Sequence, residues 1–177
     1  GAWGRFLEAL DRHHQSLPGY AVLKYGEDRS VIRADHPVGS GQVACRNIRT
    51  RKRLLWFMGL GQSPGRRDFD RLVQLGQSGV ETPAALAYIE RVAPVPESWL
   101  VTQFLDAAQD LARFVLTTLP RIAGEERAIL KRRLSLAVAK WLGSLLSSGW
   151  RHRDFKASNV LITEIRSDSP QALVVDL

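Results

Sequence analysis

The chain has 177 residues, of which 45% are hydrophobic and 24% are charged, and its formal net charge at pH 7 is +7. This length suits one domain with its own core, or one lobe of a larger fold with part of another. A single cysteine, Cys45, excludes an intramolecular disulfide and suits a reducing compartment, and no apolar run approaches the ~20 residues of a transmembrane helix.

The N-terminal part predicts a helix followed by three strands. Apolar residues recur at helical spacing within residues 1–16: Trp3, Phe6, Leu7 and Leu10. After a break at Leu17-Pro-Gly19, strand-like segments follow at residues 20–24, 30–34 and 42–48. Turn-forming residues join them. This order predicts an antiparallel meander.

Most of the basic surplus lies in one region of the chain: Arg46, Arg49, Arg51, Lys52, Arg53, Arg66 and Arg67. Residues 50–60 are basic and then apolar, which predicts an extra helix packed beside the sheet. The alternative is contact with an anionic membrane surface, with Trp56 and Phe57 at the interface. The basic residues lack the interleaved aromatic residues of a nucleic-acid-binding module, so we expect no nucleic-acid partner.

A second helix and two more strands precede a long helical region. Residues 64–75 predict a helix that stops near Gly76 and Gly79. The next segments predict strands at 84–92 and 99–105, a helix that begins at Asp106 and runs to Pro120, and a helix at 124–148. This last helix carries a wide apolar stripe: Ile129, Leu130, Leu134, Ala137, Val138, Trp141, Leu142 and Leu145.

The most specific pattern in the chain follows Gly149. The residues His152-Arg-Asp154-Phe-Lys156-Ala-Ser-Asn159 match the HRDxKxxN pattern of a kinase catalytic loop. At these offsets we expect Asp154 to accept the proton of a substrate hydroxyl, Lys156 to contact the transferring phosphoryl oxygens, and Asn159 to bind a metal ion. The alternative is a solvated turn that holds a common tripeptide by chance.

A hairpin is expected directly after this loop. Strand-like runs at residues 160–163 and 172–175 flank a polar stretch that suits a turn. Such a hairpin returns Asp176 toward Asn159, so that the two residues can share a metal ion. Asp176-Leu177 then stands where kinases have Asp-Phe-Gly.

Arg46 and Asp68 form a predicted ion pair. Val43-Ala-Cys-Arg46 falls on the third strand, where kinases carry Val-Ala-Ile-Lys with a lysine that binds the α and β phosphates. Asp68 stands where kinases place the glutamate that holds this lysine. Arginine is longer than lysine and aspartate is shorter than glutamate, so the two changes offset each other in reach. The alternative is that Arg46 and Asp68 are unrelated surface charges.

These patterns together predict an α+β, protein-kinase-like fold of two lobes. Residues 1–105 are expected to form a leader helix and a small lobe, in which an antiparallel sheet carries a helix. Residues 106–177 are expected to begin a helical large lobe, truncated at the metal-binding Asp-Leu motif. Between the lobes lies the expected hinge, where backbone groups of Gln103 to Leu105 hold adenine.

Residues from about Tyr20 to Leu177 resemble the lipopolysaccharide kinase (Kdo/WaaP) family. The matching segments are Gln42-Val-Ala-Cys-Arg46-Asn-Ile, Arg66-Arg-Asp68-Phe-Asp-Arg-Leu before Gly79-Val-Glu-Thr-Pro83, Leu100-Val-Thr-Gln-Phe-Leu105, His152-Arg-Asp-Phe-Lys-Ala-Ser-Asn159 and Val174-Val-Asp-Leu177. The Gly-Val-x-Thr-Pro turn and the Asp-Leu ending look like this group rather than like eukaryotic protein kinases. The chain departs from the kinase pattern at Arg46 and in the turn after the first strand, which has only Gly26.

The resemblance implies an ATP- and Mg²⁺-dependent phosphotransferase. Its acceptor would be a sugar hydroxyl of the lipopolysaccharide inner core or another anionic glycolipid, at the cytoplasmic face of the inner membrane. The basic surplus of the chain fits such an acceptor. The implied roles are a catalytic base for Asp154, metal ligands for Asn159 and Asp176, a γ-phosphate contact for Lys156, and the α,β-phosphate pair for Arg46 with Asp68.

Three other functions stay open. A protein Ser/Thr kinase would share the catalytic loop. A small-molecule kinase of the aminoglycoside or choline type usually has glycine in place of Arg153. A pseudokinase, which binds without catalysing a reaction, is favoured by the arginine at position 46.

Overall fold

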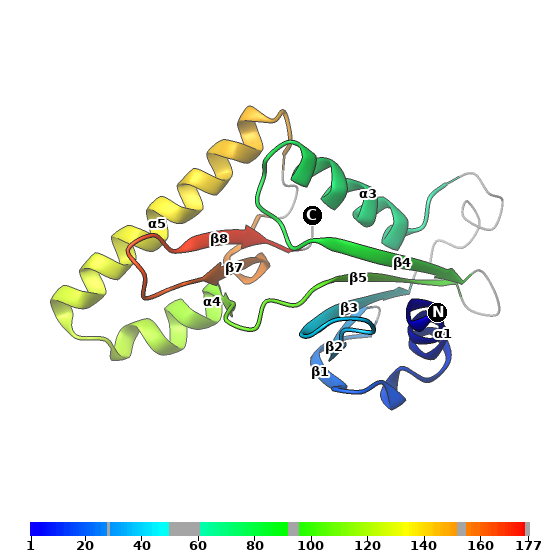
Figure 1. The fold of residues 1–177 in the computed structure, drawn as a ribbon. Helices are drawn as coiled ribbons and strands as arrows, with labels where there is room; N and C mark the ends of the chain where they lie inside the picture. The colour runs from blue at the N-terminus through cyan, green and yellow to red at the C-terminus, as the bar shows by residue number, and fades with distance from the viewer. Residues whose placement is uncertain (28, 50–60, 92–95, 152–154, 176–177) are drawn as a thin grey trace. The chain divides into compact units, whose positions relative to one another are not determined.

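The structure, a computed structural model, describes residues 1–27, 29–49, 61–91, 96–151 and 155–175 (Figure 1). The helix expected at residues 50–60 lies outside these ranges. The chain forms two compact units. Unit 1 comprises residues 1–71 and 84–104, and unit 2 comprises residues 72–83 and 105–177. The lobe boundary that the sequence predicts after residue 105 stays a prediction.

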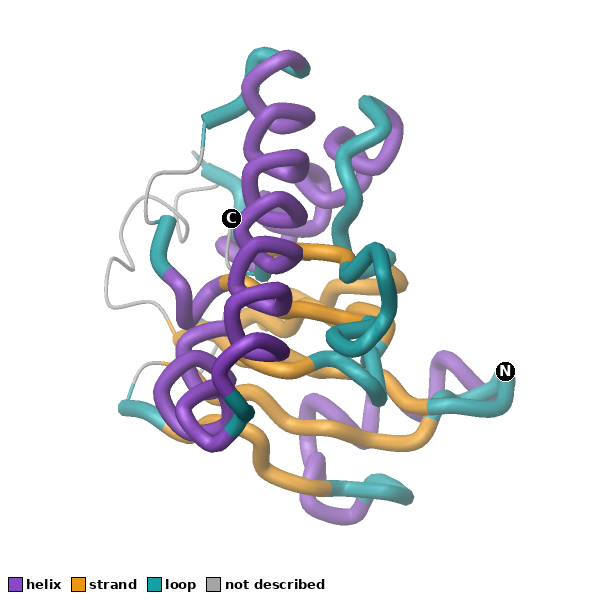
Figure 2. The backbone as a smooth tube through the Cα atoms, turned by 90° about the vertical axis from the view of Figure 1, so that its left-hand side faces the viewer, coloured by secondary structure: helices purple, strands orange, loops and turns teal. Residues whose placement is uncertain are grey.

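Unit 1 contains a five-stranded antiparallel sheet with the strand order β1-β2-β3-β5-β4 (Figures 1 and 2). Its strands are β1 (Ala21–Tyr25), β2 (Arg29–Asp35), β3 (Gln42–Arg49), β4 (Ala85–Arg91) and β5 (Glu97–Gln103). The predicted meander of the first three strands is confirmed. The central strand, β3, pairs Cys45 with Ile32 of β2 and with Val101 of β5.

Helices cover both faces of this sheet. Helix α1 (Ala2–His13) and the 3-10 turn after it (His14–Ser16) lie on one face, where Phe6 and Leu10 join a buried cluster with Val43 and Cys45. Helix α3 (Pro64–Gln77) begins on the other face, where Phe69 contacts Tyr88 at 5.2 Å between ring centroids. Because successive strand residues point to opposite faces, Arg46 faces α3 while Cys45 faces α1.

The start of α3 touches the sheet through Gly65. The backbone N–H of Gly65 donates to Oγ of buried Ser98 at 3.0 Å. A Cβ at position 65 would lie 3.0 Å from the Cβ of Ser98 and 3.1 Å from the carbonyl oxygen of Trp99. Glycine therefore lets the helix approach β5 without displacing either group.

Charged groups tie the sheet together at the start of β5. The carboxylate of Glu97, whose side chain is 6% exposed, accepts from Arg91 and lies 3.5 Å from Nε of Arg49. Arg91 also lies 3.4 Å from the carboxylate of Asp11 in α1. One buried acid thereby joins β3, β4 and β5, and its partner Arg91 extends the link to α1.

The thiol of Cys45 makes the stability of unit 1 sensitive to high pH. Cys45 is fully buried, and this burial raises the pKa of its thiol from 9.0 to about 12. Between these two values the unfolded chain releases the thiol proton and the folded chain keeps it. The free energy of unfolding should therefore be unaffected by this group below pH 9 and fall above it, by at most about 1.4 kcal/mol per pH unit.

Urea denaturation between pH 8 and 11 measures this slope. The Cys45→Ala variant should be less stable than the wild type below pH 9 because it leaves a cavity, and its stability should decline less steeply above pH 9. Identical slopes in the two proteins would contradict the assignment to Cys45.

Unit 2 is built on a long helix and a small sheet. Its elements are β6 (Gln109–Asp110), α4 (Leu111–Arg113), a π-helical turn (Phe114–Thr118), a 3-10 turn (Leu119–Arg121), α5 (Gly124–Ser147), and strands β7 (Val160–Thr163) and β8 (Gln171–Val174). The predicted long helix and the predicted hairpin are confirmed. Helix α5 ends at Ser147, and the chain turns away from it at Gly149, whose φ of +77° favours glycine.

The prediction that a helix begins at Asp106 is wrong. Gln109 and Asp110 instead pair with Ile162 and Leu161 of β7 as strand β6. The helix begins only at Leu111, where the carboxylate of Asp110 accepts from the backbone N–H of Arg113 at 2.8 Å. This N-cap satisfies one of the unpaired N–H groups of the first turn and sets the start of the helix.

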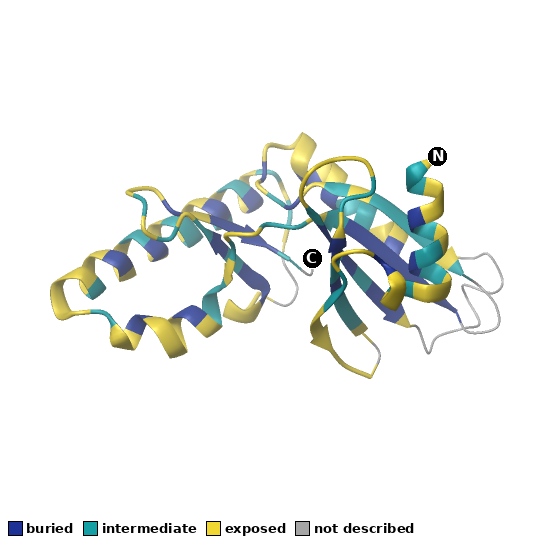
Figure 3. Ribbon diagram, turned by 60° about the horizontal axis from the view of Figure 1, so that its bottom comes forward, coloured by how far each residue is buried: buried dark blue, intermediate teal, exposed yellow. Residues whose placement is uncertain are grey.

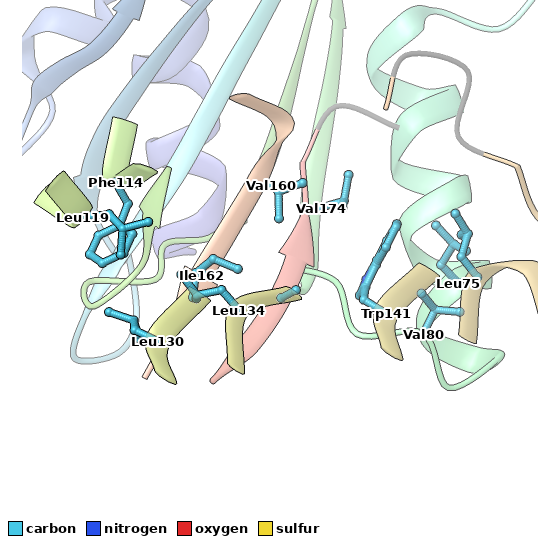
Figure 4. Close-up of a cluster of buried hydrophobic side chains, with 12 residues drawn as sticks. Leu75, Val80, Phe114, Leu119, Leu130, Leu134, Trp141, Val160, Ile162 and Val174 are labelled. Atoms are coloured by element: carbon cyan, nitrogen blue, oxygen red, sulfur yellow. The ribbon is translucent and has the colours of Figure 1, made fainter. Parts of the chain in front are cut away.

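The core of unit 2 lies between α5 and the β7–β8 hairpin. Buried residues of the helix, among them Leu134 and Trp141, pack with Val160, Ile162 and Val174 (Figure 4). Figure 3 shows buried and exposed residues alternating along the turns of α5. The predicted apolar stripe is too wide, since Ile129 is 47% exposed. Within the described ranges, none of the helices has both the length and the apolar character needed to cross a membrane.

Candidate active site

Unit 1 contributes the ion pair between Arg46 and Asp68. Nη2 of Arg46 lies 2.5 Å from Oδ2 of Asp68, and the two side chains are 15% and 10% exposed. β3 turns Arg46 toward the face that α3 covers, and α3 places Asp68 one turn after its contact with β5 at Gly65. The pair is therefore a largely buried, charge-assisted contact between the central strand and the helix.

Two backbone N–H groups of the expected hinge are hydrogen-bonded within the sheet. The N–H of Gln103 donates to the carbonyl of Ala84 at 2.9 Å, and the N–H of Phe104 donates to the carbonyl of Gln42 at 3.1 Å. These two N–H groups are thus engaged within the sheet, and the binding of adenine by the backbone of Gln103 to Leu105 stays a prediction. Among the described residues, the N–H of Leu105 has no acceptor. Its carbonyl accepts from Ala108 at 3.0 Å.

Unit 2 contributes the second half of the catalytic-loop pattern. Asp154 lies outside the described residues, together with His152 and Arg153. Residues Ala157–Asn159 form a 3-10 turn that follows exposed Lys156 and ends at Asn159, which is 3% exposed. The N–H of Asn159 donates to the carbonyl of Lys156 at 2.9 Å, which closes this turn.

The hairpin returns the chain to Asn159. The register pairs Val160 with Val174, and the N–H of Val175 donates to the carbonyl of Asn159 at 2.9 Å. Val175 directly precedes Asp176, which lies outside the described residues. The structure therefore fixes the backbone of Asn159 beside the residue before Asp176, and a metal ion shared by the two side chains stays a prediction. The described part of the chain contains no group of three or more His, Cys, Asp or Glu side chains that could hold a metal ion.

Comparison with known proteins identifies the family. Residues 46–177 match the model of the lipopolysaccharide kinase (Kdo/WaaP) family. The chain belongs to this family. No curated protein matches the chain.

Two solved structures resemble this member of the lipopolysaccharide kinase family. One is WaaP in complex with acyl carrier protein, with 26% identity and a TM-score of 0.58 over 92% of this chain and 62% of that chain. The other is Rad53 1–466 in complex with AMP-PNP, with 21% identity and a TM-score of 0.61 over 89% of this chain and 38% of that chain. The chain thus spans less than two thirds of either chain. Both similarities support the kinase-like α+β fold predicted from the sequence.

Two residues beside the predicted site of this kinase-family protein are not predicted from its sequence. Arg71 lies one helical turn after Asp68, and its Nη1 is 3.6 Å from Oδ1 of that carboxylate. Its i,i+3 spacing from Asp68 on a predicted helix was the available signal. Trp141 was predicted only as a core residue, yet its ring stacks on Phe155 in the catalytic-loop pattern.

Three guanidinium groups lie close to the carboxylate of Asp68. Arg46 and Arg71 contact its two oxygens, and Nε of Arg67 lies 4.0 Å from Oδ1. A guanidinium can bind phosphate through two parallel hydrogen bonds.

Proposed function

We propose that this lipopolysaccharide kinase family member takes part in ATP- and Mg²⁺-dependent phosphorylation of a sugar hydroxyl in the lipopolysaccharide inner core. The observation that carries the proposal is the hydrogen bond from Val175 to Asn159. It joins the end of the catalytic-loop pattern to the residue before Asp176. A hairpin that ties these two positions together is what a shared metal site requires.

The donor set suits Mg²⁺, which prefers oxygen ligands. Asn159 and Asp176 would hold the ion through an amide oxygen and a carboxylate. Bound Mg²⁺ would neutralise charge on the β and γ phosphates. Kinase-family membership, and the AMP-PNP in the similar Rad53 structure, support ATP as the phosphoryl donor.

The remaining roles fall on side chains and backbone of this chain. Asp154 would accept the proton of the acceptor hydroxyl, and Lys156 would contact the γ-phosphate. Arg46, held by Asp68, would bind the α and β phosphates. The N–H of Leu105 would donate to adenine, since those of Gln103 and Phe104 are bonded within the sheet.

The charge of the chain supports an anionic acceptor. A net charge of +7 favours association with the phosphates and carboxylates of a glycolipid. We place the protein at the cytoplasmic face of the inner membrane, with the basic and apolar residues 50–60 as the contact. Co-sedimentation with vesicles containing anionic lipid tests this placement, and equal binding after Arg51, Lys52 and Arg53 are changed to alanine would contradict it.

The similar WaaP structure also suggests a protein partner. WaaP was solved in complex with acyl carrier protein, and we propose the same partner for this protein. Co-elution in gel filtration tests the complex. Separate elution at micromolar concentrations of both proteins would count against it.

The function is tested with Mg·ATP and lipopolysaccharide whose core phosphates have been removed enzymatically. Mass spectrometry should find new phosphate on a core sugar. Phosphate on polypeptide alone would indicate a protein kinase. Nucleotide binding without transfer to either acceptor would indicate a pseudokinase.

A further inference from the structure

Trp141 of α5 contacts two segments that lie far from it in the sequence. The residue is 4% exposed. Its indole N–H donates to the carbonyl of Glu81 at 2.7 Å. Its ring stacks on Phe155, with centroids 6.2 Å apart and planes 8° apart. All three residues belong to unit 2, so both contacts lie within one compact part of the chain.

Core packing alone does not require tryptophan at this position. Leu134 and Leu145 fill neighbouring buried positions of the same helix with aliphatic side chains. A leucine at position 141 would also be apolar, but it has neither an N–H for Glu81 nor a flat face for Phe155. Phe155 is 40% exposed, so enclosure in the core does not fix its ring. The stack with Trp141 holds one face of that ring.

The hydrogen bond to Glu81 makes Trp141 a rigid support. An indole whose N–H is bound cannot turn about its side-chain torsions without breaking that bond. Glu81 belongs to the Gly-Val-Glu-Thr-Pro turn at residues 79–83, and Val80 of this turn is 2% exposed in the same core as Trp141. The indole ring that stacks on Phe155 is therefore held in place by the hydrogen bond from its N–H to the carbonyl of Glu81.

We propose that Trp141 is a positioning residue for the catalytic loop. Phe155 directly follows Asp154 in the sequence and directly precedes Lys156, so holding Phe155 restricts the backbone that leads into Lys156. The hydrogen bond between the carbonyl of Lys156 and the N–H of Asn159 then connects this restricted backbone to Asn159. The catalytic part of this inference rests on the proposed function.

The test compares Phe155→Ala, Phe155→Tyr, Trp141→Leu and the double variant Trp141→Leu/Phe155→Ala in the whole protein. Phe155→Ala and Trp141→Leu should each lower kcat about tenfold and leave KM for ATP within about twofold, because misplacement costs rate more than ground-state binding. Phe155→Tyr keeps the flat ring and should retain kcat. The double variant should lose about tenfold rather than about a hundredfold, since both changes remove one contact.

Phe114→Leu is the matched control. Phe114 is 4% exposed in the same buried cluster, and it is not part of the proposed site. This variant should lower Tm without lowering kcat. If Phe155→Ala retains wild-type kcat, or if the two losses multiply in the double variant, the positioning role is wrong.

Hydrogen exchange gives a readout that needs no activity. The amides of Asn159 and Val175 are bonded to the carbonyls of Lys156 and Asn159. In Phe155→Ala and Trp141→Leu, these amides should exchange at least about tenfold faster relative to amides of α5, and in Phe114→Leu they should not. Unchanged exchange in Phe155→Ala overturns the inference. If the wild-type protein does not phosphorylate a core sugar, the proposed function is wrong. The hydrogen-exchange measurement would still test whether Trp141 positions the loop.

Discussion

The Asp154→Asn variant should lose phosphoryl transfer by at least about a hundredfold, while its affinity for Mg·ATP changes by less than about twofold. General-base catalysis contributes rate factors of about 10² to 10⁴. An asparagine amide has nearly the same shape as the carboxylate and cannot accept the hydroxyl proton. The expected loss therefore lies in kcat. Single-turnover kinetics and calorimetric titration with Mg·ATP separate the two quantities.

Asp168→Asn is the control for this variant. Asp168 lies in the β7–β8 turn, its side chain is 92% exposed, and it pairs with Arg133 at 2.6 Å. An exposed pair of this kind contributes little to stability, so the control should keep full turnover. Full turnover in Asp154→Asn would remove the role of Asp154 as base.

The ion pair of unit 1 should give the second large effect. In Arg46→Ala, Asp68 keeps its contact with Arg71 and loses the shorter one with Arg46. We expect the free energy of unfolding to fall by about 2 to 3 kcal/mol, somewhat less than for a fully buried pair. We also expect KM for ATP to rise at least about tenfold, because the charge-assisted phosphate contact proposed for Arg46 would be lost.

Replacing Arg46 and Asp68 by lysine and glutamate tests the geometry of their contact. Arg46→Lys alone shortens the cation, and Asp68→Glu alone lengthens the acid, so each should raise KM and lower stability. The double variant Arg46→Lys/Asp68→Glu restores the combined reach and should be closer to wild type than either single variant. Strictly additive losses would show that the two residues act independently.

Strand alternation made much of unit 1 predictable. The third strand carries apolar residues at Val43 and Cys45 and a cation at Arg46, and the two faces of the sheet follow from that order. Strand β6 could not be found in the same way, because two residues are too few for a pattern. Aspartate is a helix-capping residue at position 110 as much as at 106, and the pairing of Asp110 with β7 is what delays the start of the helix to Leu111.

The candidate site was predictable where a motif fixes spacing along the chain. The catalytic-loop pattern placed Asn159 before a hairpin, and the hairpin then returns the chain to it. The contact of Trp141 with Glu81 joins residues 60 positions apart and leaves no local pattern. The bonded N–H groups of Gln103 and Phe104 were equally hidden, since backbone hydrogen bonds depend on sheet pairing and not on side-chain identity.

The close approach at Gly65 has a consequence for nucleotide affinity. The helix that bears Asp68 rests against β5 at this point, so the folding of unit 1 itself brings Asp68 into contact with Arg46. The conformational entropy that the strand and the helix lose when they come together is then a cost of folding. It does not reduce the binding affinity for a triphosphate. A side chain at position 65 would press against Ser98 and the carbonyl of Trp99, and it should thereby weaken the support that folding gives to the ion pair.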